Sequence, residues 1–116
     1  MEYKIVSYNE GETIELAQNI ESEKFPKMVI CLMGDLGTGK TVFTKGFAKA
    51  MEIDEEITSP TFNIIKEYTT GELPLYHMDV YRLDIKIKSS SEDENKRVIT
   101  IIPHGKKYEE LCEAVL

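Results

Sequence analysis

The sequence predicts an α/β fold in which a mixed, mostly parallel sheet is flanked by helices in three layers. Residues 28–32 form a continuous apolar run of strand length, which is typical of a parallel strand covered on both faces. A glycine-rich turn follows directly, and residues 40–51 then place their apolar side chains at helical spacing. Because a chain of 116 residues can bury one modest core, we expect a single domain over residues 1–116.

A strand and a helix are expected before this central unit. Residues 2–8 have the length and composition of a short strand. Thr13 is the expected N-cap of a helix over residues 13–22, because a threonine hydroxyl can accept from a first-turn N–H group. The apolar residues of this helix recur on one side, so we expect it to pack on the sheet.

The middle of the chain predicts a β-hairpin. Residues 63–68 and 75–83 have strand composition, and residues 69–72 between them read as a turn. In the second strand the period of two places Asp79 on a different face from the apolar set. His77 has no second histidine or cysteine beside it, so we expect it to pack or hydrogen-bond rather than bind a metal.

The last third of the chain predicts two strands and a closing helix. Residues 85–88 and 97–102 flank a polar stretch, residues 89–95, which reads as an exposed loop. Residues 108–115 carry apolar side chains at the i, i+3, i+4 and i+7 positions of a helix. Residues 103–105 are either a loop on the base side of a nucleotide or, as we favour, a simple turn from strand to helix.

Composition and charge narrow the function classes. The net charge of -7 would repel a phosphate backbone, so a role in nucleic-acid metabolism would leave the nucleic acid to another protein. No apolar run approaches the roughly 18 residues needed to span a bilayer, and the start does not resemble a secretory signal. We therefore expect a cytoplasmic protein without membrane contact. Cys31 and Cys112 have no partner spacing for a metal or redox pair and are expected to be core thiols.

The turn after the apolar run carries the motif of a phosphate-binding P-loop, G-x-x-x-x-G-K-[ST], in full. The residues expected to hold the nucleotide are Gly34, Asp35, Leu36, Gly37, Thr38, Gly39, Lys40 and Thr41. Lys40 would reach the β and γ phosphates, and Thr41 would offer its hydroxyl to Mg²⁺. A plain connection from strand to helix needs neither a lysine nor a threonine in fixed register. The motif therefore predicts binding of a nucleoside triphosphate with Mg²⁺.

Two further residues are candidates for nucleotide chemistry. Asp79 is either a solvated edge residue or the strand-borne carboxylate that commonly holds magnesium or its water shell in P-loop proteins. Thr61, in a Ser-Pro-Thr sequence, either senses the γ phosphate as a switch threonine or belongs to an ordinary loop. The chain lacks the Asn-Lys-x-Asp pattern with which GTPases read guanine, and this absence favours ATP.

Four motifs together resemble one family of bacterial P-loop ATPases. They are residues 33–44, the Ser-Pro-Thr-Phe sequence at 59–62, residues 73–83 with their His-x-Asp-x-Tyr-Arg pattern, and the later pair Gly105 and Tyr108. In this order they are similar to the TsaE (YjeE) family, and the resemblance covers nearly the whole chain. Any P-loop protein could supply the first motif, whereas the His-x-Asp-x-Tyr-Arg strand is specific.

The resemblance implies a role in making N6-threonylcarbamoyladenosine beside the anticodon of tRNA. Members of this family are expected to bind the TsaD and TsaB proteins, to contact tRNA only indirectly and to reset that complex by slow ATP hydrolysis. The resemblance also implies that Lys40 and Asp79 are catalytic and that Thr41 and Asp79 hold magnesium. The function expected is therefore a weak ATPase subunit of this tRNA modification machinery.

The chain departs from the family pattern after residue 84. Similar members continue with a helical stretch and a buried strand that ends in an Ile-Glu-Trp-like motif, whose glutamate is the second magnesium ligand. Here residues 83–84 run directly into residues 85–88, and the chain has no tryptophan. We favour omission of residues between 84 and 85 over a true deletion, because a lost central strand would leave the core without neighbours.

Two alternative functions follow from this departure. If the segment is truly absent, hydrolysis is in doubt and a catalytically silent, nucleotide-dependent adaptor becomes the better reading. A small-molecule kinase would need an acceptor pocket and usually arginines that close over the phosphates. The chain has only Arg82 and Arg97 and no evident lid, which disfavours the kinase.

Overall fold

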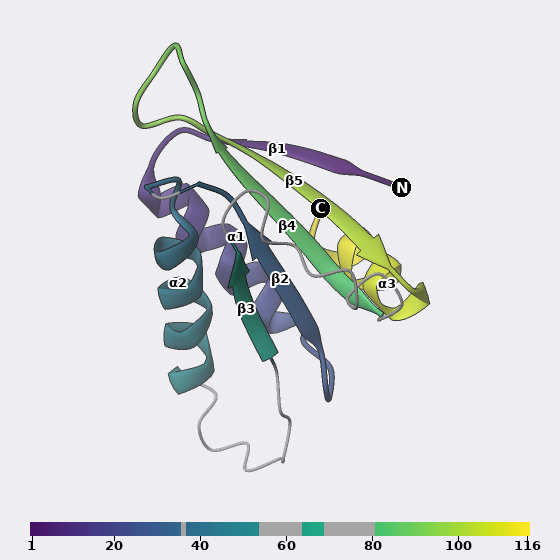
Figure 1. Cartoon of the computed structure of the whole chain (residues 1–116). Coiled ribbons are helices and arrows are strands. Elements are labelled where there is room, and N and C mark those ends of the chain that lie inside the picture. The colour runs from purple at the N-terminus through teal and green to yellow at the C-terminus, as the bar shows by residue number, and fades with distance from the viewer. Residues whose placement is uncertain (36, 54–63, 69–80) are drawn as a thin grey trace.

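The computed structural model describes residues 1–35, 37–53, 64–68 and 81–116, which form one five-stranded sheet and three helices (Figure 1). The elements in chain order are β1 (Tyr3–Ser7), α1 (Glu10–Ser22), β2 (Val29–Met33), α2 (Lys40–Ile53), β3 (Ile64–Tyr68), β4 (Arg82–Ser89), β5 (Arg97–His104) and α3 (Lys106–Val115). The strand order across the sheet is β1-β5-β4-β2-β3. The sheet is mixed, because β2 is parallel to β3 and β4 while β5 is antiparallel to β4 and β1.

The continuous apolar run forms β2, which lies between two parallel neighbours in the sheet. Ile30 pairs with Leu83 of β4 on one side, and Leu32 pairs with Glu67 of β3 on the other. Four of the five β2 residues are buried, and because successive residues point to opposite faces, both faces of this strand are covered. The predicted strand, turn and helix around the motif are therefore confirmed.

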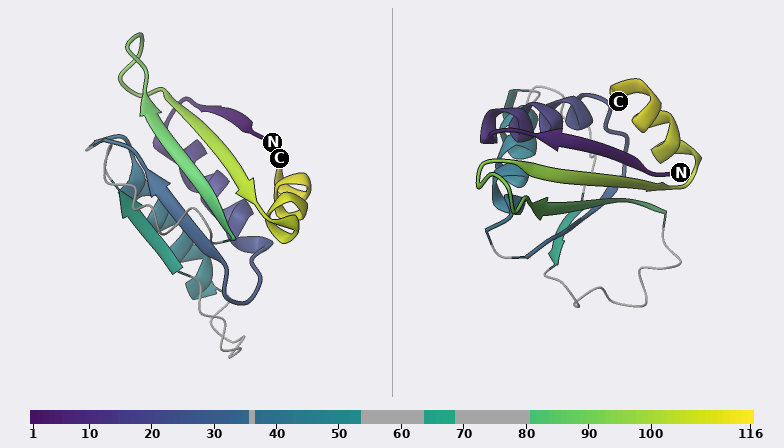
Figure 2. Two further views of the ribbon diagram at one scale, coloured as in Figure 1. Left: turned by 45° about the vertical axis from the view of Figure 1, so that its right-hand side comes forward. Right: turned by 90° about the horizontal axis from the view of Figure 1, so that it is seen from above.

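The hydrophobic core lies between one face of the sheet and the helices (Figure 2). Alternate residues of β4, namely Leu83, Ile85 and Ile87, point into this core. The helices contribute Leu16, Ala17, Ile20, Phe43, Phe47, Tyr108, Leu111 and Cys112 to the same cluster. The α/β class with a mixed sheet is confirmed. Within the residues that the structure describes, all three helices pack on this face, so the second helical layer of the predicted three-layer fold stays a prediction.

Helix α1 begins earlier than the sequence predicts. Asn9 is its N-cap, and the Asn9 side chain accepts a hydrogen bond from the Glu12 N–H at 2.9 Å. Asparagine caps at least as well as threonine, and Glu10 and Glu12 add negative charge in the first turn, where the helix dipole favours it. Thr13 lies inside the helix, where its buried hydroxyl is 2.7 Å from Ser7 Oγ. Its prediction as the N-cap was wrong.

The prediction of a hairpin over residues 63–83 was wrong for the part of it that the structure describes. Strand β3 pairs with β2, and β2 separates it from residues 82–83 of β4. Residues 82–89 form one strand, whereas we predicted that one strand would end at 83 and another begin at 85. The reason is that alternate apolar residues continue through β4 without a break, so the whole segment pairs as one strand. Residues 75–80 of the predicted strand lie outside the described residues.

Two contacts set the positions of the helices. A Cβ at Gly46 of α2 would lie 3.1 Å from Ile14 Cα and 3.2 Å from Ala17 Cβ, so α1 and α2 approach closely at a glycine. At the start of β2, the Tyr108 hydroxyl of α3 accepts a hydrogen bond from the Val29 N–H at 2.9 Å. None of the helices in the described part of the chain is long and apolar enough to cross a membrane.

Candidate functional site

The turn between β2 and α2 is held by its own backbone. The Thr38 N–H and hydroxyl both donate to the Asp35 carbonyl, at 3.2 and 2.8 Å. Gly37 and Gly39 have φ angles of 82° and 105°, in the left-handed region that favours glycine over any residue with a Cβ. The two glycines therefore allow a tight loop that ends at Lys40, the first residue of α2.

Gly34 fits the loop closely against β4. A Cβ at this position would lie 2.6 Å from the Ile87 carbonyl oxygen and 2.6 Å from Thr38 Oγ1. The first of these atoms is backbone and cannot move aside as a flexible side chain would. A glycine at residue 34 is therefore required by the packing of the loop.

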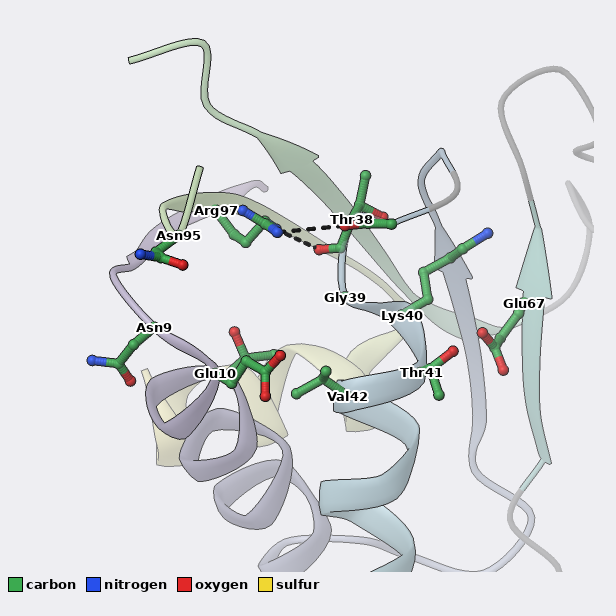
Figure 3. Close-up of a pocket in the computed structure, with 12 residues that line it drawn as sticks. Asn9, Glu10, Thr38, Gly39, Lys40, Thr41, Val42, Glu67, Asn95 and Arg97 are labelled. Carbon is green, nitrogen blue, oxygen red and sulfur yellow. Dashed lines mark hydrogen bonds between the residues drawn. The ribbon is translucent and has the colours of Figure 1, made fainter. Parts of the chain in front are cut away.

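A cavity of about 370 Å³ opens above the loop (Figure 3). It is lined by Asn9, Glu10, Thr13, Gly37, Thr38, Gly39, Lys40, Thr41, Val42, Glu67, Asn95 and Arg97. Five of the eight predicted loop residues, Gly37 to Thr41, thus meet at one cavity. Gly34 and Asp35 shape the turn, and Leu36 lies outside the described residues.

The start of α2 places positive charge on one side of this cavity. Lys40 is 8% exposed and lines the wall, and Thr41 follows it in the first helical turn. The first N–H groups of a helix have no partner within the helix, and they carry the positive end of its dipole. Since no acidic residue lies in the first turn of α2, this end of the cavity suits an anion such as a phosphate.

Glu67 is a site residue that sequence reasoning missed. It lies near the end of β3 and pairs with Leu32, whose side chain faces the helices. Its carboxylate therefore lies on the α2 side of the sheet, and Figure 3 draws it on the same side of the cavity as Lys40 and Thr41. The sequence could not reveal this, because it does not show that β3 lies beside β2.

The opposite side of the cavity is built from two other parts of the chain. Asn9 and Glu10 come from the start of α1, whereas Asn95 precedes β5 and Arg97 begins it. These four residues were also missed as site residues. The close approach of α1 to α2 brings the first pair to the loop, and β5 brings the second pair.

Several predicted residues fall outside the described part of the chain. They are Thr61, His77 and Asp79, and their roles stay predictions. In the described residues, no group of three or more histidine, cysteine, aspartate or glutamate side chains could hold a metal ion. Cys31 and Cys112 are buried free thiols, as predicted. Burial raises the pKa of the Cys112 thiol to about 11, which keeps it protonated and unreactive.

Residues 103–105 do not reach the cavity. His104 ends β5 and pairs with Arg82 at the start of β4, at the opposite end of the strands from the loop. There Asp84 accepts hydrogen bonds from Arg82 Nε at 2.8 Å and Arg82 Nη2 at 3.2 Å, and His104 Nε2 lies 2.9 Å from Asp84 Oδ2. Gly105 is the N-cap of α3. Pro103 and His104 therefore belong to β5, and the predicted turn from strand to helix is confined to Gly105.

Comparison with known proteins finds one family. A family model described as "Threonylcarbamoyl adenosine biosynthesis protein TsaE" matches residues 7–114. A Bacillus subtilis (strain 168) protein named "tRNA threonylcarbamoyladenosine biosynthesis protein TsaE" is 39% identical over 141 residues, covering 90% of this chain and 88% of that protein. A Nostoc protein of the same name is 57% identical over 56 residues, covering 48% of this chain and 35% of the relative. The last match thus spans little more than a third of its relative.

The fold is also similar to a solved structure. The crystal structure of Bacillus subtilis YdiB matches with a TM-score of 0.79 and 26% sequence identity, covering 99% of this chain and 94% of that one. The alignment with the Bacillus subtilis TsaE protein has a further property. The alignment is 141 residues long, whereas 90% of this 116-residue chain is only about 104 residues. About 37 positions of the alignment are therefore gaps in this chain.

Proposed function

Because this chain belongs to the TsaE family, which takes part in tRNA threonylcarbamoyladenosine biosynthesis, we propose that it is the ATP-binding and ATP-hydrolysing subunit of that machinery. The observation that carries the proposal is the cavity above residues 37–41, where a buried lysine, a helix N-terminus and a threonine hydroxyl meet. Its volume of about 370 Å³ lies within the usual range for small-molecule sites.

The donor set of the cavity fits a triphosphate. The loop N–H groups and Lys40 supply donors and positive charge for the β and γ phosphates. In this proposal Lys40 contributes to catalysis because it binds the γ-phosphoryl group that ATP transfers to water and offsets its negative charge. Asn9 and Asn95 line the far side and offer uncharged hydrogen-bonding groups, which suit the nucleoside end of ATP.

The oxygen ligands around the cavity also fit Mg²⁺, which prefers hydroxyl, carboxylate and water oxygens. Thr41 would hold the ion directly, and Glu67 on the same side of the cavity would bind one of its waters. We propose Asp79 as a further residue that binds the magnesium ion. Asp79 and Lys40 are the two proposed catalytic residues. When bound, Mg²⁺ supplies charge neutralisation at the β and γ phosphate oxygens.

The partners follow from the family and from charge. We propose that this protein acts on the TsaD and TsaB proteins in the cytoplasm and contacts tRNA only through them. The net charge of -7 supports the proposal that the partners, and not this protein, bind the tRNA, because a polyanion such as tRNA would be repelled at long range. Thr61 is retained as a proposed switch that senses the γ phosphate.

Calorimetric titration with ATP and Mg²⁺ tests the proposal, followed by phosphate release with and without the TsaD and TsaB proteins. We expect saturable ATP binding, weaker GTP binding and slow turnover that the partners increase. Absence of ATP binding at millimolar concentrations would refute the proposed function.

A second candidate is a nucleotide-dependent adaptor that binds ATP without hydrolysing it. The specific observation in its favour is that about 37 positions of the Bacillus subtilis relative have no counterpart here. Tight ATP binding with no phosphate release, even with TsaD and TsaB present, would support the adaptor over the ATPase.

A further inference from the structure

The guanidinium of Arg97 holds the P-loop from β5. Arg97 Nε donates to the Thr38 carbonyl at 2.9 Å, and Arg97 Nη2 donates to the Gly37 carbonyl at 3.4 Å (Figure 3). Arg97 is 59 residues later in the chain than Thr38 and also lines the cavity. One side chain therefore contacts both the backbone of the loop and the space above it.

The same guanidinium contacts the connection between β4 and β5, residues 90–96. Arg97 Nη1 donates to the Lys96 carbonyl at 3.0 Å and also to the Glu94 carbonyl. The connection is closed by its own bond from the Ser90 N–H to the Lys96 carbonyl at 3.1 Å. Arg97 thus joins this connection to the P-loop through four carbonyl oxygens.

These contacts constrain which way a loop N–H group points. The Thr38 carbonyl and the Gly39 N–H belong to one planar peptide and point in opposite directions. Because Arg97 holds the Thr38 carbonyl, the Gly39 N–H is directed away from Arg97. Gly39 lines the cavity, where an N–H group is needed as a phosphate donor.

The charge of Arg97 is not neutralised by these partners. A guanidinium stays protonated in proteins, and all four acceptors are neutral carbonyls. In the described part of the chain, no carboxylate forms an ion pair with Arg97. The cavity wall therefore carries two cations, Lys40 and Arg97, which offset the two carboxylates of its lining, Glu10 and Glu67, and which can attract an anionic ligand.

We propose that Arg97 is a positioning residue for polyphosphate binding, and that it couples residues 90–96 to the P-loop. This inference rests on the proposed function in one respect only, that the anion is the triphosphate of ATP. Arg97 presets the loop before the nucleotide arrives, and its charge strengthens binding of the phosphates. Nucleotide binding then stabilises residues 90–96, because the same side chain holds both segments.

Three variants test the binding part. Arg97→Gln removes the charge and most donors, Arg97→Lys keeps the charge without the planar fork, and Lys96→Gln removes the same charge from a side chain outside the cavity lining. Lys96 lies 6.0 Å from the Tyr8 ring instead. We expect Arg97→Gln to weaken ATP and ADP binding by about tenfold or more, Arg97→Lys to lie between, and Lys96→Gln to stay within about twofold.

Hydrogen exchange of the protein without nucleotide tests the positioning part. In Arg97→Gln we expect faster exchange at residues 37–39 and 90–96 together, with unchanged exchange in α3 (Lys106–Val115). If the wild type binds no ATP while this exchange pattern appears, the proposed function fails and the positioning role stands.

The inference is overturned if Arg97→Gln keeps native circular dichroism and shows wild-type affinity and exchange. Equal effects of Lys96→Gln and Arg97→Gln would also overturn it, because a general charge effect would then be sufficient. Should Arg97→Gln not fold, Arg97→Lys carries the test: wild-type affinity and exchange in that variant would count against the role of the planar fork.

Discussion

Gly34 lies so close to Ile87 that a Cβ at residue 34 would be 2.6 Å from the Ile87 carbonyl oxygen. Gly34→Ala would force the loop and β4 apart, because the obstructing atom is backbone. We expect a loss of about 1–3 kcal/mol in unfolding free energy, together with weaker ATP binding. Urea unfolding and calorimetry check the two effects.

Gly37→Ala is the matched comparison for this substitution. A Cβ at Gly37 meets no atom within 4 Å, but φ is 82°, so the cost arises from backbone strain alone. We expect about 1–2 kcal/mol for this variant, no more than for Gly34→Ala. A larger effect at Gly37 than at Gly34 would contradict the packing argument.

Lys40→Ala is expected to weaken the binding of phosphates strongly. Lys40 is the buried cation of the cavity, and charged hydrogen bonds of this kind contribute about 1.5–3 kcal/mol each. ATP affinity should therefore fall by about 10- to 100-fold, which calorimetry can measure. The control is Lys45→Ala, an exposed lysine of α2 outside the cavity lining, which should bind ATP as the wild type does.

Asp79→Ala is expected to keep ATP binding and to lose turnover. The reason is the proposed role of Asp79 beside the metal, which concerns the reaction more than the phosphate contacts of the loop. Equilibrium binding and phosphate release are measured on the same sample. Full turnover in this variant would remove Asp79 from the catalytic assignment.

Glu67→Gln is expected to raise the Mg²⁺ concentration required for half-maximal ATP binding by about threefold or more, because a neutral amide is a poorer partner for the water shell of the ion. Glu10→Gln is a matched control, since Glu10 is an exposed carboxylate on the other side of the same cavity. Magnesium titrations at fixed ATP distinguish the two. An equal shift in both variants would indicate a general charge effect.

The intact mass of the purified protein tests the expected omission after residue 84. A mass several kilodaltons above 13.3 kDa would show that residues are present beyond those of this sequence. A mass near 13.3 kDa would support a true deletion and would favour the adaptor over the ATPase. Electrospray mass spectrometry distinguishes these outcomes directly.

Much of the local structure could be predicted from the sequence. The apolar run over residues 28–32, the glycine-rich turn after it and the Lys-Thr pair at 40–41 each have a physical cause within a few residues. The strand and the helix around this turn were found within two residues of their predicted bounds. The hairpin was wrong because strand pairing depends on which neighbour offers the better packed face. The apolar alternation of β4 also continued through residues 83–87, where we had placed a break.

The sequence by itself determined the P-loop, the α/β class and the resemblance to the TsaE family, because motif spacing and periodicity are properties of the chain. Only the tertiary structure decided that Glu67 and Arg97 belong to the same cavity as Lys40. The order β4-β2-β3 and the position of β5 bring these side chains together across long stretches of chain. Such contacts form only when the strands assemble in this order and the helices pack on the sheet, and no local sequence pattern specifies that order.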